Sequence, residues 1–426
     1  MRNRSWRNVW KEYVQIAKKK IVFSNFAKED TVTYEKWIIK KEVIVVEGKT
    51  KTCTKYKKDS LQCSLGDLVS ELEGIFPKFM SHVNNMCHQH REMAKLKKKL
   101  PPNSIVIHMD FSENYNCKVS QEIQAFHFGG SREQVSIHTV MVYYRNETSE
   151  LPMKKAYCTL SDSLRHDPVA IMAHLQPIFT EIKQLVLSIT SLHFLSDGPS
   201  TQYRNRKMFA LSTYIASCFP VAESITWNYS ESGHGKGAPD GLGGTLKHTA
   251  EYLVAQGKDI SDFSTRVLEL TDHVKGITVI SVPKECIEQF SNTLDLRTPK
   301  PFKGTLRVHQ VTWARNETNS RLHFRRLSCF RCRPSRSHYD IGYLDISNDD
   351  EKPPEITHSS LPQKRLKYSD VYSSYDSECE ETKGTLLKKI HDDDLVNTFV
   401  VVEYKSKKSV RTTLGWFSRR KWVAFV

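Results

Sequence analysis

Three aspartates in the central part of the chain have the residue type and surroundings that phosphodiester chemistry needs. Asp110 follows an apolar run at 104–109, Asp197 follows a second run at 192–196, and Asp240 lies in a glycine-rich stretch. Two divalent ions about 3.5–4 Å apart can activate an attacking oxygen and stabilise a leaving one, and Mg²⁺ or Mn²⁺ prefers hard carboxylate oxygens. These aspartates are therefore predicted as catalytic residues and as ligands of Mg²⁺ or Mn²⁺.

Each of these acids also has a purely structural interpretation. Aspartates are common turn formers, and both Asp197-Gly198-Pro199 and Pro239-Asp240-Gly241 are favourable turn sequences. Glu231 competes for the position of the third carboxylate. Glu113 could also reach bound metal ions, but a surface or supporting position is the expectation for it.

The acids can act together only if the surrounding elements bring them to one place. Hydrophobic patterns and turn residues predict, in chain order, a strand at 104–110, a hairpin of strands at 121–128 and 135–144, a strand at 156–160, a helix at 168–187, a strand at 192–197, a helix at 201–219, a strand at 224–229 and a helix at 243–254. Strands that alternate with helices favour an α/β fold with a mixed sheet flanked by helices. Three antiparallel strands followed by strand–helix units are the order of an RNase H-like fold. If the strands that end at Asp110 and Asp197 are parallel neighbours, both carboxylates emerge at one edge, and the last helix could add Asp240.

The charge of the chain favours a polyanionic partner. Lys and Arg number 63 against 48 Asp and Glu, which gives a formal charge of +15. Neutralising phosphates releases counterions, although many basic proteins bind no nucleic acid. The predicted DNA-contacting residues lie near the acids or in an Arg-rich segment at 321–336, and they are His234, Lys236, Tyr203, Arg204, Arg206, Arg325 and Arg326.

These DNA contacts have alternatives. Glycine-rich backbone before a helix offers N–H groups to a phosphate, but the same stretch at 234–247 is equally compatible with a flexible loop. Tyr203 and the arginines after it suit stacking and phosphate contact, or simply a solvated helix N-terminus. The Arg-rich segment is likewise compatible with a solvated basic face.

Three sequence blocks resemble a known group of proteins. The blocks are His108-Met-Asp-Phe-Ser-Glu-Asn-Tyr, Ser196-Asp-Gly-Pro-Ser-Thr-Gln-Tyr-Arg-Asn and Ser232-Gly-His-Gly-Lys-Gly-Ala-Pro-Asp-Gly-Leu-Gly-Gly. They resemble a large group of uncharacterised animal proteins that are similar to transposon-derived DDE-type transposases. The resemblance spans about residues 60–330 and implies an RNase H-like catalytic core, a divalent metal, DNA strand transfer and an acidic triad of Asp110, Asp197 and Asp240. The third block differs from the group at Ala238-Pro239, where the group often has Pro-Cys. This difference weakens the assignment of Asp240 more than that of the other two acids.

The rest of the chain predicts four further regions around the core at 104–256. Residues 1–103 are expected to form a mostly helical N-terminal region, and 257–344 an α/β extension that contains the Arg-rich segment. Residues 345–390, rich in Asp, Glu, Ser and Pro, predict a disordered linker. Residues 391–426 alternate apolar and polar residues and predict a small strand-rich module that resembles part of an SH3-like barrel.

Cysteine use, hydropathy and short basic clusters bear on cofactors and location. Cys329 and Cys332 form one CxxC pair, but a structural Zn²⁺ needs four ligands. His309, His323 and His338 are the nearby candidates. The chain contains no run of 18 apolar residues, so no membrane span is expected. Scattered cysteines without an export signal favour a reducing compartment. A basic cluster at 364–367 is a candidate nuclear import signal, so a nuclear DNA-binding protein is expected. A homo-oligomer is a further expectation for the partners of the chain.

Two main functional hypotheses follow from these patterns. The first is a metal-dependent enzyme that cleaves DNA phosphodiesters and transfers strands, for which the intact acids argue. The second is a domesticated, catalytically inactive DNA- or chromatin-binding protein, for which the altered third block argues. A nuclease of RNA or of RNA–DNA hybrids is a third alternative.

Overall fold

The computed structural model describes residues 29–46, 49–121, 132–293, 300–315, 321–332 and 339–346, and the backbone of 398–406, 409–418 and 421–425. The chain forms two compact units, one from Met1–Pro77 with Ser359–Val426 and one from Lys78–His358. The strand predicted at 121–128 and the linker predicted at 345–390 fall almost wholly outside the described residues. The import signal at 364–367 and His338 fall wholly outside them. Within the described residues, no helix is long and apolar enough to cross a membrane.

The first unit contains a long antiparallel hairpin. In it, β1 (Thr31–Val46) pairs with β2 (Lys49–Ser64) from one end to the other. Most residues of β1 are β-branched or aromatic, which favours a strand. The prediction that residues 1–103 are mostly helical is therefore wrong for this segment. It missed the strand because the charged residues of β1 stand in adjacent groups, such as Lys40-Lys41-Glu42, and so do not mark a period of two. It is correct for the long helix α2 (Leu65–Lys98).

The C-terminal part of the first unit is a three-stranded antiparallel sheet. Its strands are β12 (Thr398–Ser406), β13 (Ser409–Ser418) and β14 (Lys421–Phe425). This part is strand-rich, as the alternation of residues predicted. Its assignment to an SH3-like barrel stays a prediction.

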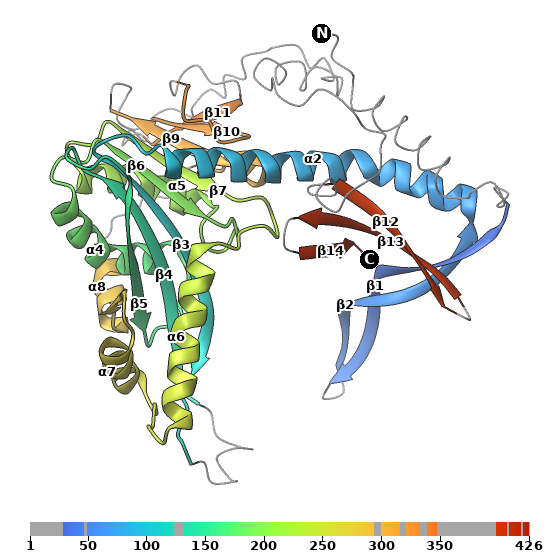
Figure 1. Ribbon diagram of the computed structural model, residues 1–426, viewed down its shortest axis with the longest axis horizontal. Coiled ribbons are helices and arrows are strands. Elements are labelled where there is room, and N and C mark those ends of the chain that lie inside the picture. Colours follow the sequence, from blue (N-terminus) through green and yellow to red (C-terminus); the bar gives the residue numbers. More distant parts are fainter. Residues whose placement is uncertain are drawn as a thin grey trace. The chain divides into compact units, whose positions relative to one another are not determined.

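The second unit is built on a nine-stranded sheet with the order β11-β10-β9-β7-β6-β3-β4-β5-β8 (Figure 1). The strands are β3 (Ser104–Asn116), β4 (Gln134–Arg145), β5 (Met153–Ser161), β6 (Ser191–Ser196), β7 (Ser224–Tyr229), β8 (Ile277–Ser281), β9 (Gln310–Ala314), β10 (Arg321–Arg325) and β11 (Asp340–Asp345). The helices are α4 (Pro168–Leu185), α5 (Arg206–Cys218), α6 (Ala238–Ala255), α7 (Phe263–His273), α8 (Lys284–Thr293) and the C-terminal part of α2.

The sheet is mixed, and helices flank it as the sequence predicted. Strands β3, β6 and β7 are parallel neighbours, whereas β4 is antiparallel to both β3 and β5. The segment after α6 extends the same sheet at both edges: β8 is parallel to β5, and β9 to β11 continue antiparallel beyond β7. The extension predicted at 257–344 is therefore continuous with the central sheet.

One face of the central strands is apolar. Ile107 of β3, Phe194 of β6 and Trp227 of β7 are at most 1% exposed and pack against α4 and α5 in the main core. The rings of Phe194 and Trp227 stack with their centroids 4.7 Å apart. Asp167 caps the N-terminus of α4 by accepting hydrogen bonds from two backbone N–H groups. Burying a side chain of this size contributes about 1.5–3 kcal/mol, so this face supplies much of the stability.

The opposite face of the same strands is polar. His108 of β3, His193 of β6 and Asn228 of β7 are buried there. The C-terminal part of α2 covers one region of this face, where Leu96 and Leu100 contact Val106. Helices α6 and α7 cover β4 and β5 through a second apolar cluster. The predicted acids lie between these two covered regions.

Candidate active site

The register of the parallel strands brings Asp110 and Asp197 together. Ser104 of β3 lies opposite Ser191 of β6, and His108 lies opposite Leu195. Continuing this register by two residues pairs Asp110 with Asp197 on the polar face. The predicted proximity of these two acids is therefore confirmed.

Asp110 does not end its strand, contrary to the prediction. β3 continues to Asn116 because β4 pairs with it far beyond Asp110, whereas β6 ends at Ser196. Asp110 therefore lies where β3 loses its parallel partner but keeps its antiparallel one, opposite Thr139. The site opens at this step in the sheet.

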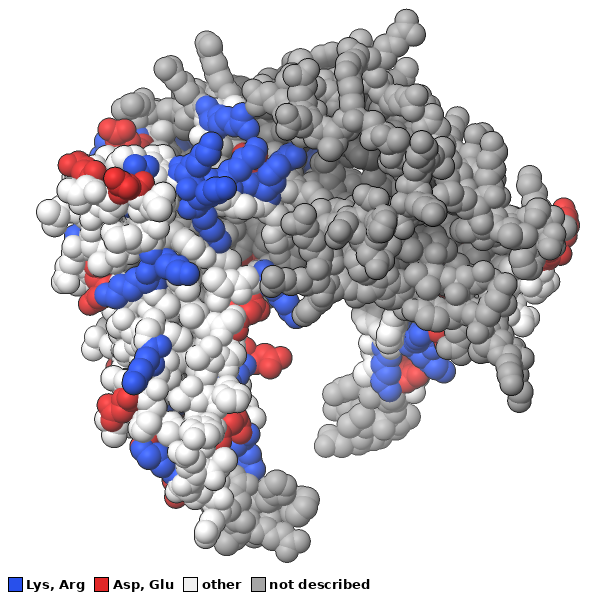
Figure 2. All heavy atoms as spheres, in the orientation of Figure 1, with Lys and Arg blue, Asp and Glu red and all other residues white. Residues whose placement is uncertain are grey.

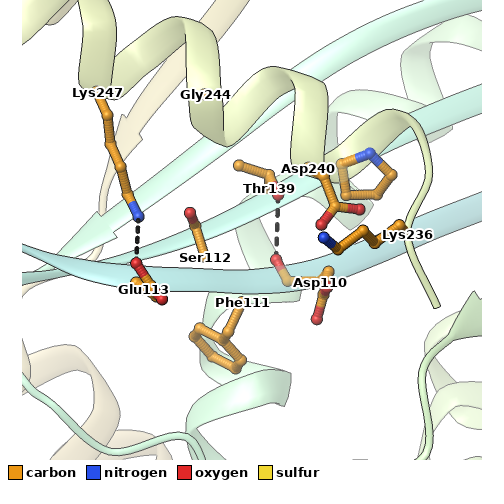
Figure 3. Close-up of a pocket in the computed structure, with 10 residues that line it drawn as sticks. Asp110, Phe111, Ser112, Glu113, Thr139, Lys236, Asp240, Gly244 and Lys247 are labelled. Atoms are coloured by element: carbon orange, nitrogen blue, oxygen red, sulfur yellow. Dashed lines mark hydrogen bonds and ion pairs between the residues drawn. The ribbon is translucent and has the colours of Figure 1, made fainter. Parts of the chain in front are cut away.

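Helix α6 brings Asp240 to the pair. Asp240 is in the first turn of α6, and one carboxylate oxygen, Oδ2, accepts a hydrogen bond of 2.6 Å from the backbone N–H of Gly237. A hollow of about 360 Å³ separates this helix end from β3. Asp110 of β3, Asp240 of α6 and Lys236 of the preceding loop point into it (Figure 3).

Two glycines allow the loop and helix to approach the sheet. A Cβ atom at Gly235 would lie 2.7 Å from the Cβ of Asp197, and one at Gly243 would lie 2.7 Å from the Oγ of Ser112. Any larger residue would push the segment away from the strands. The glycine-rich stretch thus has a packing function, and its predicted contact with phosphate stays a prediction.

Burial and mutual repulsion perturb the pair. Burial, followed by the charges of Asp197 and Asp240, raises the pKa of Asp110 to about 7. Burial raises the pKa of Asp197 to about 6, although the Arg204 guanidinium opposes this and Asp240 reinforces it. Two neighbouring carboxylates that resist ionisation together are stabilised in their charged forms by a cation.

The residues fit a divalent cation by charge and donor type. Oδ1 of Asp197 is buried and has no hydrogen-bond partner, so it is available to a cation. Hard carboxylate oxygens suit Mg²⁺ or Mn²⁺. Nevertheless, in the described part of the chain no three His, Cys, Asp or Glu side chains already stand in a metal-binding arrangement. Asp110 and Asp197 therefore form the core of the candidate site, which Asp240 approaches from α6.

Arg204 fixes the turn after Asp197. Its guanidinium donates hydrogen bonds to the carbonyl oxygen of Gly198, at 3.0 and 3.1 Å, and to those of Leu306 and Val308, at 3.1 and 3.2 Å. Arg204 is 6% exposed. The prediction that Arg204 contacts DNA is therefore wrong in this structure, because its donors serve the backbone of the turn.

Tyr203 and Arg325 are also buried, so their predicted contacts with DNA do not agree with the structure. Tyr203 is 0% exposed, and its hydroxyl lies 3.2 Å from Nε2 of His138 beneath the aspartates. Arg325 is 1% exposed and donates to the side chain of Gln310 and to the carbonyl oxygen of Cys329. Charge and position in the chain suggested a surface location, but each side chain satisfies buried polar groups instead.

Glu231, the competitor for the third carboxylate position, belongs to a histidine cluster. Its two oxygens lie 3.3 Å from Nδ1 of His82 and 3.1 Å from Nε2 of His309. Burial acts to raise its pKa, but the hydrogen bond and the charge of His309 outweigh this and lower the pKa to about 2. Among these two candidates, Asp240 rather than Glu231 acts electrostatically on the aspartate pair. His82 belongs to α2, and the sequence contained no signal for this distant partner.

The remaining predicted residues lie at different depths. Lys236 and Arg206 are exposed. His234 is half-buried, with its Nε2 3.1 Å from Nε2 of His82. Arg326 is half-buried and donates to the hydroxyl of Ser81. Of the predicted DNA contacts, Lys236 is the one that both points into the hollow and is exposed.

The CxxC pair lies in the loop after β10. The sulfur atoms of Cys329 and Cys332 are 3.1 Å apart. Of the two described histidines proposed as further zinc ligands, His309 contacts Glu231, and the ring of His323 lies 6.2 Å from that of Tyr343. A Zn²⁺ site at this pair stays a prediction.

The fold and the site define a mixed α/β protein with clustered carboxylates at an interruption of its central sheet. Residues 89–328, more than half of the 426-residue chain, match a family described as Domain of unknown function (DUF8701). The chain belongs to this family, and the matched segment contains Asp110, Asp197 and Asp240. No curated protein and no solved structure matches the chain.

Proposed function

We propose that this protein is a DDE-type transposase-like enzyme that binds DNA and catalyses metal-dependent phosphodiester cleavage and strand transfer. The observation that carries the proposal is the pairing of Asp110 with Asp197 on parallel strands, with Asp240 close enough to raise both pKa values. Two half-buried carboxylates held together against their own repulsion are costly unless they serve a ligand. A phosphodiester reaction with divalent ions is the chemistry that uses such a pair.

The strand order supports the same proposal. The central strands β5-β4-β3-β6-β7 consist of three sequential antiparallel strands followed by two parallel ones. This is the order expected for an RNase H-like core, and the acids lie on its first strand and directly after its fourth. The nuclear location implied by a DNA substrate is part of this proposal.

Each residue of the site then has a defined task. Asp110 and Asp197 bind the cation, and Asp240 contributes a third carboxylate from α6. Arg204 positions Asp197 by holding the turn that follows it. Lys236, exposed at the hollow, attracts the phosphate of the scissile strand. A bound divalent ion would activate the attacking water or 3′-hydroxyl and offset charge on the leaving oxygen.

A cleavage assay with Mg²⁺ or Mn²⁺ tests the proposal. Asp110→Asn and Asp197→Asn keep the shape of the side chains but remove their charge, so each is expected to lower the rate by at least about 100-fold. Asp272→Asn, at an exposed position of α7, is the matched control and is expected to cleave like wild type. Equal cleavage by all four proteins would refute the proposal.

One observation favours a second candidate, an inactive DNA- or chromatin-binding protein. The Gly237 N–H already engages Oδ2 of Asp240, which closes the first turn of α6. This structural use of Asp240 does not require catalysis. Wild-type protein that binds DNA and does not cleave it with either metal would support this candidate.

A further inference from the structure

The C-terminal part of α2 has one side docked on the sheet and one side exposed. Gln89 donates a hydrogen bond of 2.7 Å to the carbonyl oxygen of Tyr229, and Nε2 of His88 lies 2.8 Å from that of Ser328. Met93 and Leu96 are buried on the same side. These contacts hold the last turns of the helix in a fixed orientation.

The exposed side of these turns is basic. The exposed residues between 87 and 99 are Cys87, His90, Arg91, Ala94, Lys95, Lys98 and Lys99. They include no acid. The acid of this segment, Glu92, is 8% exposed and lies 3.2 Å from Lys95 and 3.9 Å from Arg91, so it partly offsets those charges. Figure 2 shows Lys and Arg atoms gathered over this end of α2.

The spacing of these cations suits a phosphate backbone. Arg91, Lys95 and Lys98 are four and then three residues apart, so they form one stripe about 10 Å long on the helix. Duplex DNA carries about one charge per 1.7 Å of its axis, so a stretch of that length presents about six phosphate charges. Because the stripe is held on a docked helix, its backbone is already ordered before DNA binds.

The helical turns that carry the stripe contact β3 close to Asp110. Lys97, on the inner side of the same turns, places its Nζ 3.1 Å from Nδ1 of His108. His108 precedes Asp110 by two residues on the same face of β3, a distance of about 7 Å along the strand. The stripe and the hollow therefore lie on the same face of the sheet.

We propose that the exposed stripe of α2, formed by Arg91, Lys95, Lys98 and Lys99, binds the phosphate backbone of duplex DNA beside the aspartates. This inference rests on the proposed function, because it takes DNA as the substrate. It assigns the main phosphate contact to a helix that precedes the catalytic core, in place of the buried Arg204 and Arg325.

Salt-dependent binding tests the stripe. The full-length Arg91→Ala/Lys95→Ala/Lys98→Ala variant is compared with wild type, using anisotropy of a labelled duplex of about 30 base pairs without divalent ions. Each lost phosphate contact lowers the slope of log K against log salt by about 0.9. The slope is therefore expected to fall by about 2–3, and the affinity at low salt by at least about 10-fold.

A matched control removes the same charge elsewhere. Lys154, Lys183 and Lys275 are exposed on β5, at the end of α4 and before β8, and their triple alanine variant is expected to keep the wild-type slope. If the α2 triple variant does not fold, as judged by circular dichroism, Lys98→Glu alone is expected to weaken binding, whereas Lys98→Arg retains it.

Three results would overturn the inference. The first is an unchanged salt slope in the α2 triple variant, and the second is an equal change of slope in the control variant. The third is a loss of affinity in the α2 variant that is seen only with an RNA duplex of the same length. The binding assay needs no chemistry, so it separates this inference from the proposed function. If the protein binds DNA through α2 but does not cleave it, only the proposed enzymatic function is refuted. If it cleaves DNA and the α2 variant keeps the wild-type slope, only the DNA-binding role of the stripe is refuted.

Discussion

The two faces of β3, β6 and β7 are made by alternate residues of the same strands but differ in what they do. On one face, Ile107 and Trp227 are packed among apolar neighbours. On the other, Asn228 is equally buried, yet it donates to Phe194 O and accepts from Gln310. The aspartates share this second face, where Oδ1 of Asp197 is buried without a hydrogen-bond partner. The comparison teaches that one set of strands provides both a stabilising core and a site that opposes stability.

The largest expected effect is on the apolar face. Trp227→Ala removes a ring stacked on Phe194 and leaves a cavity, so the free energy of unfolding should fall by about 3–5 kcal/mol. Thermal or denaturant unfolding measures it. A loss below about 1 kcal/mol would show that this face is not the main source of stability.

The contact between α6 and the polar face is expected to be sensitive to one methyl group. Gly243→Ala places a Cβ against Ser112, so the helix must shift, and the free energy of unfolding should fall by about 1–3 kcal/mol. Gly241→Ala, which meets nothing within 4 Å, should be neutral or stabilising by up to about 1 kcal/mol. If both variants melt alike, the close packing is not required.

A substitution in the aspartate pair is expected to raise the free energy of unfolding, not to lower it. The pKa of Asp110 is about 7 in the folded protein against an ordinary value of 3.8, so the folded state binds more protons between these values. Stability therefore falls as pH rises through this window. In chelator at about pH 8, Asp110→Asn should raise the free energy of unfolding by about 1 kcal/mol after discounting for solvent screening, and Tm by about 2–4 °C.

The same variant provides its own control at low pH. Below about pH 3 the Asp110 carboxyl is protonated in both the folded and the unfolded protein, so the gain in Tm should vanish. A variant that is less stable than wild type across the whole range would show that the Asp110 carboxylate is well accommodated without a ligand.

The smallest effect is expected from added metal. Mg²⁺ or Mn²⁺ at twice its dissociation constant should stabilise the wild-type protein by about 0.6 kcal/mol. The Asp110→Asn/Asp197→Asn double variant should show no such gain, whereas Asp272→Asn should match wild type. An equal rise in Tm for all three proteins would locate the cation elsewhere.

Much of the central sheet could be predicted from the sequence because its strands are short, apolar and separated by amphipathic helices. The pairing of Asp110 with Asp197 followed from two such strands being parallel neighbours. The hairpin at 31–64 was missed because adjacent charged residues in β1, such as Lys40-Lys41-Glu42, obscure the period of two. Helix α7 was also missed, since a surface helix with few apolar residues has a weak pattern.

The depth of polar side chains could not be predicted. Tyrosine and arginine are residue types typical of a DNA-binding surface, yet Tyr203, Arg204 and Arg325 are buried. Their partners, such as Leu306 for Arg204 and Gln310 for Arg325, are distant in the chain or on another strand. Local sequence carries no information about these partners. Only the fold reveals that the guanidinium groups of Arg204 and Arg325 bind buried polar groups of the protein itself.

The Arg204 contacts make one position critical for the turn after Asp197. A lysine has the same charge but one nitrogen, and it cannot span carbonyl groups of Gly198, Leu306 and Val308 together. Relatives that keep both aspartates but lose this arginine would therefore hold an acidic pair on an unanchored turn. The residue at position 204 of a relative would thus indicate, from sequence alone, whether its acidic turn can be anchored as it is here.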